Sequence, residues 1–444
     1  MAKGKKSTER RPASEALTAI RVAGFKCFRD PVDVAIRPLT LLAGANSGGK
    51  SSLMQPLLLM KQTLEAPFDP GPLLLDGPLV RVEMATTLGW RGKTSRDRAT
   101  TFSVETGGAK HRVESTFSVN AKRSGVKLAS TDYKHRSMRL TENMSEDDLS
   151  RLAETVFGPG GSTRFKLTVD RSRSFLYAMP MFRDAPEVSK RNDLLTVLQD
   201  WGHEDHSTLL LNLIDLPGLR GNPERAYPRT HATERFPGPF QSYTAGLLLG
   251  WRETKDDRLA AVGHDLLTLG LSWKVDPRPR GDTGVEVQIG RLPRPRQGGA
   301  SDMVNIADVG FGASQVLPVV VALQTARPGQ VVHIEQPELH LHPRAQAAMA
   351  DLLIAAAKRQ AIVIVETHSS VLLLAVQRRI AEGVITPAEV ALHWFERDED
   401  GASHVRTADL DQKGAYGDWP VDFAEVEMEV ERAYIDAAFG AEPT

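Results

Sequence analysis

The strongest constraint on this chain is a glycine-rich segment near its start. Residues 44–51, Gly-Ala-Asn-Ser-Gly-Gly-Lys-Ser, fit the pattern G-x-x-x-x-G-K-[ST]. An apolar run at 39–43 predicts a strand before it, and 52–64 predicts a helix after it. Such a loop wraps a phosphate chain with backbone N–H groups at a helix N-terminus. The predicted contacts are Gly44, Asn46, Ser47, Gly48, Gly49, Lys50, Ser51 and Ser52, with Lys50 on the β- and γ-phosphates and Ser51 holding Mg²⁺.

Composition bounds the rest. The chain has 444 residues, enough for two or three domains, and 55 Lys+Arg balance 56 Asp+Glu. One cysteine, Cys27, excludes an intramolecular disulfide and fits a reducing cytoplasm. The sequence contains no run of about eighteen apolar residues, so it predicts no membrane span. The basic start, 1–11, lacks the apolar stretch of a secretory signal. We therefore expect a cytoplasmic protein with no membrane segment.

A second motif lies far along the chain. Residues 331–335, Val-Val-His-Ile-Glu, form an apolar run that ends in a carboxylate, and Gln336-Pro337-Glu338 follow. A buried strand that delivers an acid to Mg²⁺ is typical of the Walker B motif, and the next polar group can position the attacking water. We therefore predict that Glu335 is a metal ligand together with Ser51.

Two further elements accompany these motifs. The small-residue turn 309–315 opens an apolar helix, predicted at 316–323, and permits close approach of a phosphate to the backbone. After the Walker B motif, the apolar strand predicted at 361–365 ends in Glu366-Thr367-His368-Ser369. The elements thus occur in the order P-loop, signature turn, Walker B and strand-end histidine.

In this order the chain resembles the ABC-type ATPases, in the branch that contains SMC-like and OLD-family ATPases. Residues 334–343 fit the pattern I-E-x-P-E-x-H-L-H-P of bacterial ATPases, and 24–28, Gly-Phe-Lys-Cys-Phe, look like the F-[KR]-x-F start of that branch. The resemblance covers 16–60 and 300–375, extends to 217–228 and 418–420, and says little about 80–210.

The resemblance implies an α/β fold: an ABC-type P-loop ATPase head assembled from the N- and C-terminal parts, with an inserted mixed α+β lobe. The resemblance also implies ATP and Mg²⁺ as cofactors. It implies a homodimer or higher homo-oligomer with ATP sandwiched between heads, where Gly312 and Ser314 of one subunit contact the ATP on the other. His368 matches the switch histidine that senses the γ-phosphate. Residues 311–315 depart from the family's L-S-G-G-Q, so only their position is carried over.

Gln336 is the sharpest departure from the family, which usually has glutamate there to polarise the attacking water. A glutamine orients water but cannot accept a proton at neutral pH. Two interpretations stay open. Either hydrolysis is slow and the protein acts as an ATP-loaded clamp, or Glu338 helps; a salt bridge explains Glu338 equally well. The catalytic candidates are Gln336, Glu338 and His368.

Other clusters favour structural explanations. His203 and His206 predict a polar helix surface rather than a metal site. The pair Asp398 and Asp400 resembles a nuclease acid pair, but Asp400-Gly401 is first a hairpin signal. Arginines among prolines and glycines in 276–300 favour a solvated loop over a phosphate-binding patch.

Six segments follow from these patterns. They are a disordered basic tail (1–15), the P-loop part of the head (16–75), an inserted β-rich and helical lobe (76–214), a Pro/Gly/Arg-rich connecting region (215–300), the C-terminal part of the head (301–405), and an extension with an acidic amphipathic helix (406–444).

Three functions remain open. The first is an ATPase that senses or handles nucleic acid, with DNA as a possible partner, and controls a separate effector such as a nuclease or toxin. Its branch points to anti-phage defence or DNA repair. The second is a nucleotide-gated assembly scaffold with little hydrolysis, which Gln336 favours. The third is the motor subunit of a membrane transporter, against which the large charged insertion argues.

Overall fold

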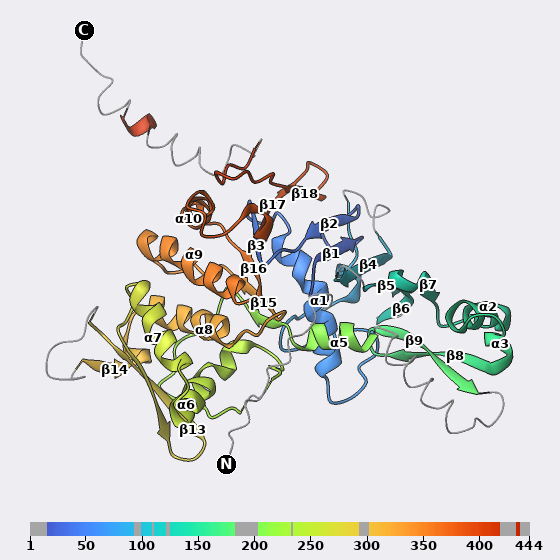
Figure 1. Cartoon of the computed structure of the whole chain (residues 1–444), viewed down its shortest axis with the longest axis horizontal. Coiled ribbons are helices and arrows are strands. Elements are labelled where there is room, and N and C mark those ends of the chain that lie inside the picture. The colour runs from blue at the N-terminus through green and yellow to red at the C-terminus, as the bar shows by residue number, and fades with distance from the viewer. Residues whose placement is uncertain are drawn as a thin grey trace, which may run out of the picture.

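The computed structural model describes residues 16–92, 99–108, 111–120, 125–182, 203–231, 234–292, 302–417 and 432–435. Two six-stranded sheets occupy the centre, and a four-stranded sheet and a two-stranded hairpin lie outside them (Figure 1). Short 3₁₀ turns are η2 Ala85–Thr87, η3 Lys134–Arg136, η4 Phe240–Tyr243, η5 Ile306–Asp308 and η6 Pro387–Glu389. The architecture is α/β, as the sequence predicts.

The first sheet is built from both ends of the chain. Its order is β10 (Ile214–Leu216), β15 (Val331–Glu335), β16 (Ile362–Glu366), β3 (Leu39–Gly44), β17 (Val390–Arg397) and β18 (Ser403–Thr407). The first five strands are parallel, and β18 returns antiparallel after the predicted Asp400-Gly401 turn. The strands predicted at 39–43, 331–335 and 361–365 are confirmed, because their apolar runs are buried on both faces.

Five helices lie on one side of this parallel sheet and contribute to one apolar core (Figure 1). They are α6 (Thr244–Thr254), α7 (Arg258–Thr268), α8 (Phe311–Thr325), α9 (Pro343–Lys358) and α10 (Ser370–Ala381). Helices α8 and α9 contact the strands directly, and α6 and α7 pack outside them. Helix α8 contains the predicted 316–323 run. It is apolar all round and buried from Val316 to Leu323, as a central helix must be.

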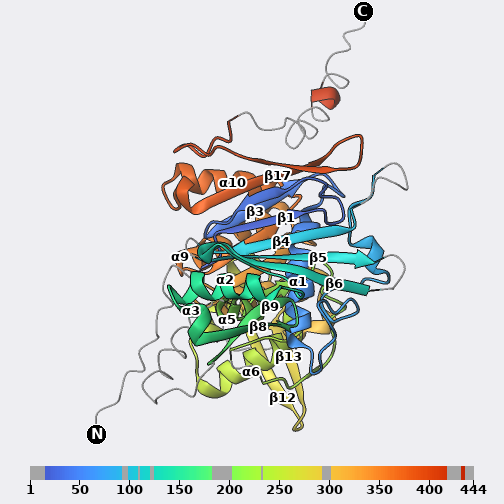
Figure 2. The same ribbon diagram turned by 90° about the vertical axis from the view of Figure 1, so that its right-hand side faces the viewer.

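Helix α1 (Lys50–Glu65) packs between the parallel sheet and the second, antiparallel one. The second sheet has the order β2 (Val32–Ala35), β1 (Ala19–Ala23), β4 (Thr101–Gly107), β5 (Arg112–Asn120), β6 (Gly125–Tyr133) and β7 (Met138–Leu140). Figure 2 shows these strands following one another from β1 to β6. The buried Pro56 lies inside α1, which continues through it to Glu65.

The segment predicted as an inserted lobe, 76–214, contributes strands β4 to β7 to this second sheet. Strand β4 pairs antiparallel with β1, with Ala19 opposite Gly107. Farther out lie α2 (Glu146–Phe157), α3 (Gly161–Arg164) and the hairpin of β8 (Phe165–Ser172) and β9 (Phe175–Phe182), which face the viewer in Figure 2. The N-terminus of α2 is capped, because the Ser145 side chain accepts a hydrogen bond from the Asp148 N–H. Helix α5 spans His203–Leu211.

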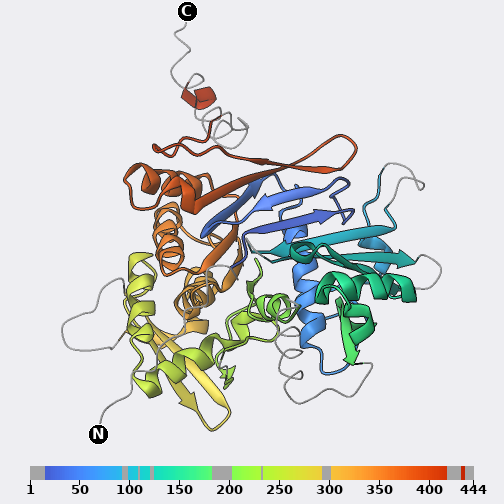
Figure 3. The same ribbon diagram turned by 45° about the vertical axis from the view of Figure 1, so that its right-hand side comes forward.

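The stretch predicted as a connecting region is folded. Besides α6 and α7, it contains β11 (Tyr227–Pro228), β12 (Val275–Arg280) and β13 (Gly284–Gly290), and β13 also pairs with β14 (Met303–Asn305) (Figure 3). Pro277 and Pro279 suggest a loop in the sequence. Here they alternate along an edge strand, where a missing N–H costs no ladder bond.

Among the described residues, no helix combines the length and the apolar character needed to cross a bilayer. The predicted C-terminal amphipathic helix falls almost wholly outside the described residues, which include only the helical turn 432–435 of it.

The packing of α1 between two sheets predicts a large effect of a cavity there. Leu57 is fully buried, whereas Leu374 on α10 is 57% exposed. We expect Leu57→Ala to lower the free energy of unfolding by about 2–5 kcal/mol, measured by urea denaturation. Leu374→Ala is the matched control and should leave it nearly unchanged. Equal effects of the two substitutions would contradict this account of the core.

Candidate functional site

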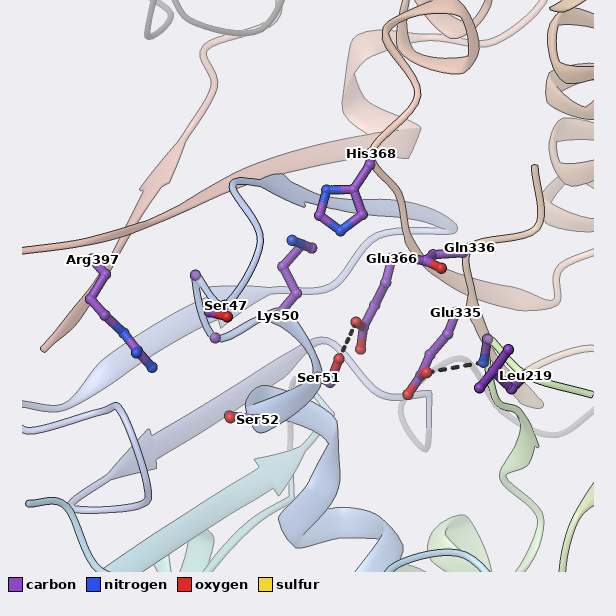
Figure 4. Close-up of a pocket in the computed structure, with 13 residues that line it drawn as sticks. Ser47, Lys50, Ser51, Ser52, Leu219, Glu335, Gln336, Glu366, His368 and Arg397 are labelled. Carbon is purple, nitrogen blue, oxygen red and sulfur yellow. Dashed lines mark hydrogen bonds between the residues drawn. The ribbon is translucent and has the colours of Figure 1, made fainter. Parts of the chain in front are cut away.

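The C-terminal ends of the parallel strands meet at one cavity of about 450 Å³ (Figure 4). The P-loop follows β3, Glu335 ends β15, Glu366 ends β16, and Gly218 follows β10. The full lining is Ser47, Gly48, Gly49, Lys50, Ser51, Ser52, Gly218, Leu219, Glu335, Gln336, Glu366, His368 and Arg397. This is where open α/β sheets bind ligands, and the volume suits a small molecule.

The backbone of the P-loop packs closely against strand β17. Gly44 has a φ of 135°, and a Cβ on it would lie 2.2 Å from the Phe395 carbonyl oxygen. Gly49 has a φ of 108° and stands at the N-cap of α1. Only glycine combines these backbone angles with so close an approach. Of the residues predicted to bind nucleotide, Gly44 and the exposed Asn46 belong to the loop without lining the cavity.

Lys50 is the first residue of α1 and is almost fully buried. Its Nζ donates hydrogen bonds to the carbonyl oxygens of Gly44 and Ala45, each at 2.9 Å. Burial lowers the pKa of this ammonium, and the charges of Glu366 and Glu338 oppose that shift. The Lys50 side chain therefore lies against the backbone of the P-loop.

Three oxygen-bearing side chains gather beside Lys50. The Ser51 hydroxyl donates to Glu366 Oε2 at 2.6 Å, and the Gly218 N–H donates to Glu335 Oε2 at 3.0 Å. Burial, and then the charge of Glu366, raise the pKa of Glu335. A hydroxyl and carboxylates are hard donors of the kind Mg²⁺ takes, so the predicted metal ligands Ser51 and Glu335 fit that ion. The sequence assigned no role to Glu366.

Behind these acids lies a buried histidine. His333 is fully buried, with Nδ1 2.7 Å from Asp215 Oδ1 and Nε2 3.1 Å from Glu366 Oε1. Burial opposes the charged ring, but hydrogen bonds to Asp215 and Glu366 outweigh it and raise the pKa of His333 to about 10. The ring is thus a cation that donates from both nitrogens. It lies near Glu335 and Glu366, with their ligand atoms within 4.8 Å of one another, yet it has no lone pair left for a metal.

Of the three catalytic candidates, Gln336, Glu338 and His368, two line the cavity and one does not. Gln336 and His368 line the cavity, and Gln336 has a left-handed φ of 44°, held by a 2.7 Å hydrogen bond from its N–H to the Glu366 carbonyl. Burial, and then the nearby Lys50, lower the pKa of His368, so its ring is neutral at pH 7. Glu338 is buried outside the lining. Its Oε1 accepts hydrogen bonds from Thr367 Oγ1 at 2.7 Å and from the His368 N–H at 3.0 Å.

The signature turn lies away from the P-loop of its own chain. Ser314 lines a different cavity, of about 390 Å³, and its hydroxyl donates to the Phe311 carbonyl at 3.1 Å. Gly312 does not line the P-loop cavity. Phe311 is 52% exposed, with its ring 5.8 Å from that of His340. Neither Gly312 nor Ser314 therefore meets the P-loop cavity within one subunit.

A short segment joins the Walker B strand to the signature helix. The buried Arg220 donates from Nη2 to the Glu335 carbonyl at 2.5 Å, and its N–H donates to Gln315 Oε1 at 3.3 Å. Gln315 in turn donates from Nε2 to the Gly221 carbonyl at 2.6 Å. Burial lowers the pKa of Arg220 to about 10. The family resemblance extends over this segment but implies no role for Arg220 or Gly221.

Three other positions clarify the sequence patterns. Arg397, at the end of β17, lines the cavity across the P-loop from Glu335 (Figure 4). Its signal is a charge that ends an apolar strand, as at Glu335. Asp398 accepts hydrogen bonds from the N–H groups of Asp400 and Ala402, so this acid caps the hairpin turn. His206 is buried and lies 2.9 Å from the Thr106 carbonyl.

Comparisons with solved structures match the chain to heads of SMC proteins. The chain is similar to a crystal structure of the SmcHead bound to the C-winged helix domain of ScpA, with 13% identity, a TM-score of 0.50, and coverage of 89% of this chain and 98% of that one. It also matches the SMC head domain from Thermotoga maritima (10% identity, TM-score 0.41, 89% and 100% covered). A third match is the Smc head domain with an extended coiled coil bound to the C-terminal domain of ScpA derived from Pyrococcus furiosus (13%, 0.46, 94% and 99%).

Residues 296–375 match a family model described as "AAA domain, putative AbiEii toxin, Type IV TA system". This match spans the signature turn, the Walker B motif and the strand-end histidine. No curated protein matches the sequence. Together with the topology, the first structural match shows that the chain has the fold of an SMC head, an ABC-type P-loop ATPase fold.

The buried histidine predicts a stability effect. His333→Leu would leave Asp215 and Glu366 buried without the cation between them. We expect the free energy of unfolding to fall by about 3–5 kcal/mol, measured by urea denaturation at pH 7. The control is His404→Leu, which removes an exposed pairing with Asp398 and should change little. A parent-like His333→Leu would contradict the charged pairing.

Proposed function

We propose that this protein binds ATP with Mg²⁺ and acts as an ABC/SMC-like ATPase. One observation carries the proposal: a single cavity at the ends of parallel strands is lined jointly by the P-loop, Glu335, Gln336 and His368. These residues come from sequence positions nearly 300 apart, and the P-loop pattern alone does not require them to meet. The SMC-head fold supports the same function.

The chain's residues would divide the work as follows. Lys50 turns from its loop carbonyls to the β- and γ-phosphates, while the N-terminus of α1 favours their charge. Ser51 and Glu335 hold Mg²⁺, which when bound neutralises charge on the phosphate oxygens. Gln336 orients the attacking water by hydrogen bonding, and the neutral His368 offers a ring nitrogen toward the γ-phosphate.

A complete site would require a second copy of the chain. Gly312 and Ser314 lie outside the cavity of their own P-loop, so they are free to serve the ATP of a partner head. The half-exposed Phe311 beside them gives that face an apolar contact. We propose a head-to-tail homodimer with ATP between the subunits, as the resemblance implies.

The setting we propose is control of a separate effector, such as a nuclease or toxin, in anti-phage defence or DNA repair within the cytoplasm. The description of the matching family model names a toxin and a toxin–antitoxin system, which supports a defence setting. The similar SMC head is bound to a domain of another protein, ScpA, which supports a head that works through partners. Nucleic acid would then be what the protein senses or handles.

A second candidate is a nucleotide-gated scaffold with little turnover. Gln336 favours it, because no carboxylate occupies the usual water-activating position and Glu338 is engaged with Thr367 and the His368 backbone. In this case the ATP state would set assembly, and hydrolysis would only reset it.

ATP binding itself depends on Lys50. We expect Lys50→Ala to weaken ATP binding by at least about 2 kcal/mol, the scale of a charge-assisted contact, in titration calorimetry. Lys358→Ala removes an exposed lysine at the end of α9 and should bind like the parent. Unchanged affinity in Lys50→Ala would remove the P-loop assignment.

Turnover separates the two candidate functions. We expect Gln336→Glu to raise steady-state phosphate release by about 10- to 100-fold, since a carboxylate can act as a general base. Gln360→Glu is a matched control, because Gln360 is also a glutamine with positive φ (68°) but is exposed at the far end of α9. A fast parent that Gln336→Glu leaves unchanged would count against the slow-clamp interpretation.

A further inference from the structure

Glu366 is a second carboxylate in the phosphate cavity. It ends β16 directly opposite Glu335 at the end of β15, and it is only 4% exposed. Each of its oxygens has a partner: Oε2 accepts from the Ser51 hydroxyl at 2.6 Å and Oε1 from His333 Nε2 at 3.1 Å. The carboxylate is thus fixed from both sides, with one oxygen on the P-loop serine.

The histidine behind it explains how a second acid is kept there. His333 Nδ1 lies 2.7 Å from Asp215 Oδ1, and Nε2 lies 3.1 Å from Glu366 Oε1, so both ring nitrogens face carboxylates. This contact holds one oxygen of Glu366 and leaves the other directed to Ser51.

We propose that Glu366 is a ligand of the nucleotide-bound Mg²⁺, alongside Ser51 and Glu335. The inference rests on the proposed ATP binding and adds to it a carboxylate outside the Walker B motif. The contact with Ser51 carries it: the hydroxyl that serves the ion already touches this carboxylate, and both are oxygen donors that Mg²⁺ prefers.

A competing role for Glu366 is that of general base, in place of the missing carboxylate at Gln336. The orientation of the side chain argues against it. Figure 4 shows the Glu366 carboxylate directed to Ser51, on the side of the cavity away from the His368 ring. Water attack on the γ-phosphate would belong to the side of Gln336 and His368.

The test measures ATP affinity with and without metal. In titration calorimetry on the full chain, Glu366→Gln should weaken binding at least about 10-fold with Mg²⁺ present, the scale of losing even an outer partner of a metal site. With EDTA, affinity should stay the same or rise, since a negative charge near the phosphates is gone. Glu253→Gln, in an exposed pair with Arg229, is the control and should match the parent in both conditions.

Other outcomes would overturn the assignment of Glu366 as a Mg²⁺ ligand. Equal weakening with and without Mg²⁺ would make Glu366 a structural residue and overturn the proposal. Unchanged binding in both conditions with lost phosphate release would make it the base, and would also overturn it. A parent that binds no ATP would instead refute the proposed function. If Glu366→Gln fails to fold, Glu366→Asp keeps the charge beside His333. The proposal then requires this variant to bind more weakly only with Mg²⁺, and to hold less Mn²⁺ in electron paramagnetic resonance of the ATP complex.

Discussion

The site depends on a buried imidazolium that ties three strands together. His333 on β15 lies between Asp215 on the neighbouring β10 and Glu366 on the neighbouring β16. Two carboxylates in so dry a place would repel each other and lose hydration, and the cation between them offsets both costs. The same hydrogen bonds fix the direction of Glu366, which reaches Ser51 in the P-loop. A pairing inside the sheet thus sets the geometry at its edge.

The segment after β10 extends this order to the signature helix. Arg220 binds the backbone of Glu335, and its N–H reaches Gln315, four residues into α8. Gly218 donates to the Glu335 carboxylate at the same time. The acid that would face the metal and the turn that would face a second subunit therefore share one short chain segment. A continuous set of hydrogen bonds therefore joins the Walker B acid to the signature helix.

Local patterns in the sequence predict much of this fold, and long-range pairing accounts for the rest. The P-loop strand and helix and the Walker B strand depend on neighbours in the chain, and each was predicted. The pairing of β1 with β4 depends on residues far apart in the chain, and the edge position of the prolines in β12 depends on the order of strands in the sheet. Neither can be read from local composition. The role of Glu366 could not be predicted for the same reason. Its position opposite Glu335 depends on the register between two strands. His333, which contacts Glu366, is held by Asp215, 118 residues earlier in the chain.

The glutamine at 336 makes sense in the charge balance of the cavity. The family pattern places two acids after one strand, whereas this chain has one there, Glu335, and a second at the end of the next strand, Glu366. The number of carboxylates facing the cavity is therefore still two. A third at position 336 would add repulsion among groups whose burial already raises the pKa of Glu335. The left-handed backbone of Gln336, bonded to the Glu366 carbonyl, keeps its amide at the cavity whichever acid serves the metal. With Glu366 on the metal side of the site, as we propose, this arrangement fits the proposed scaffold with little turnover.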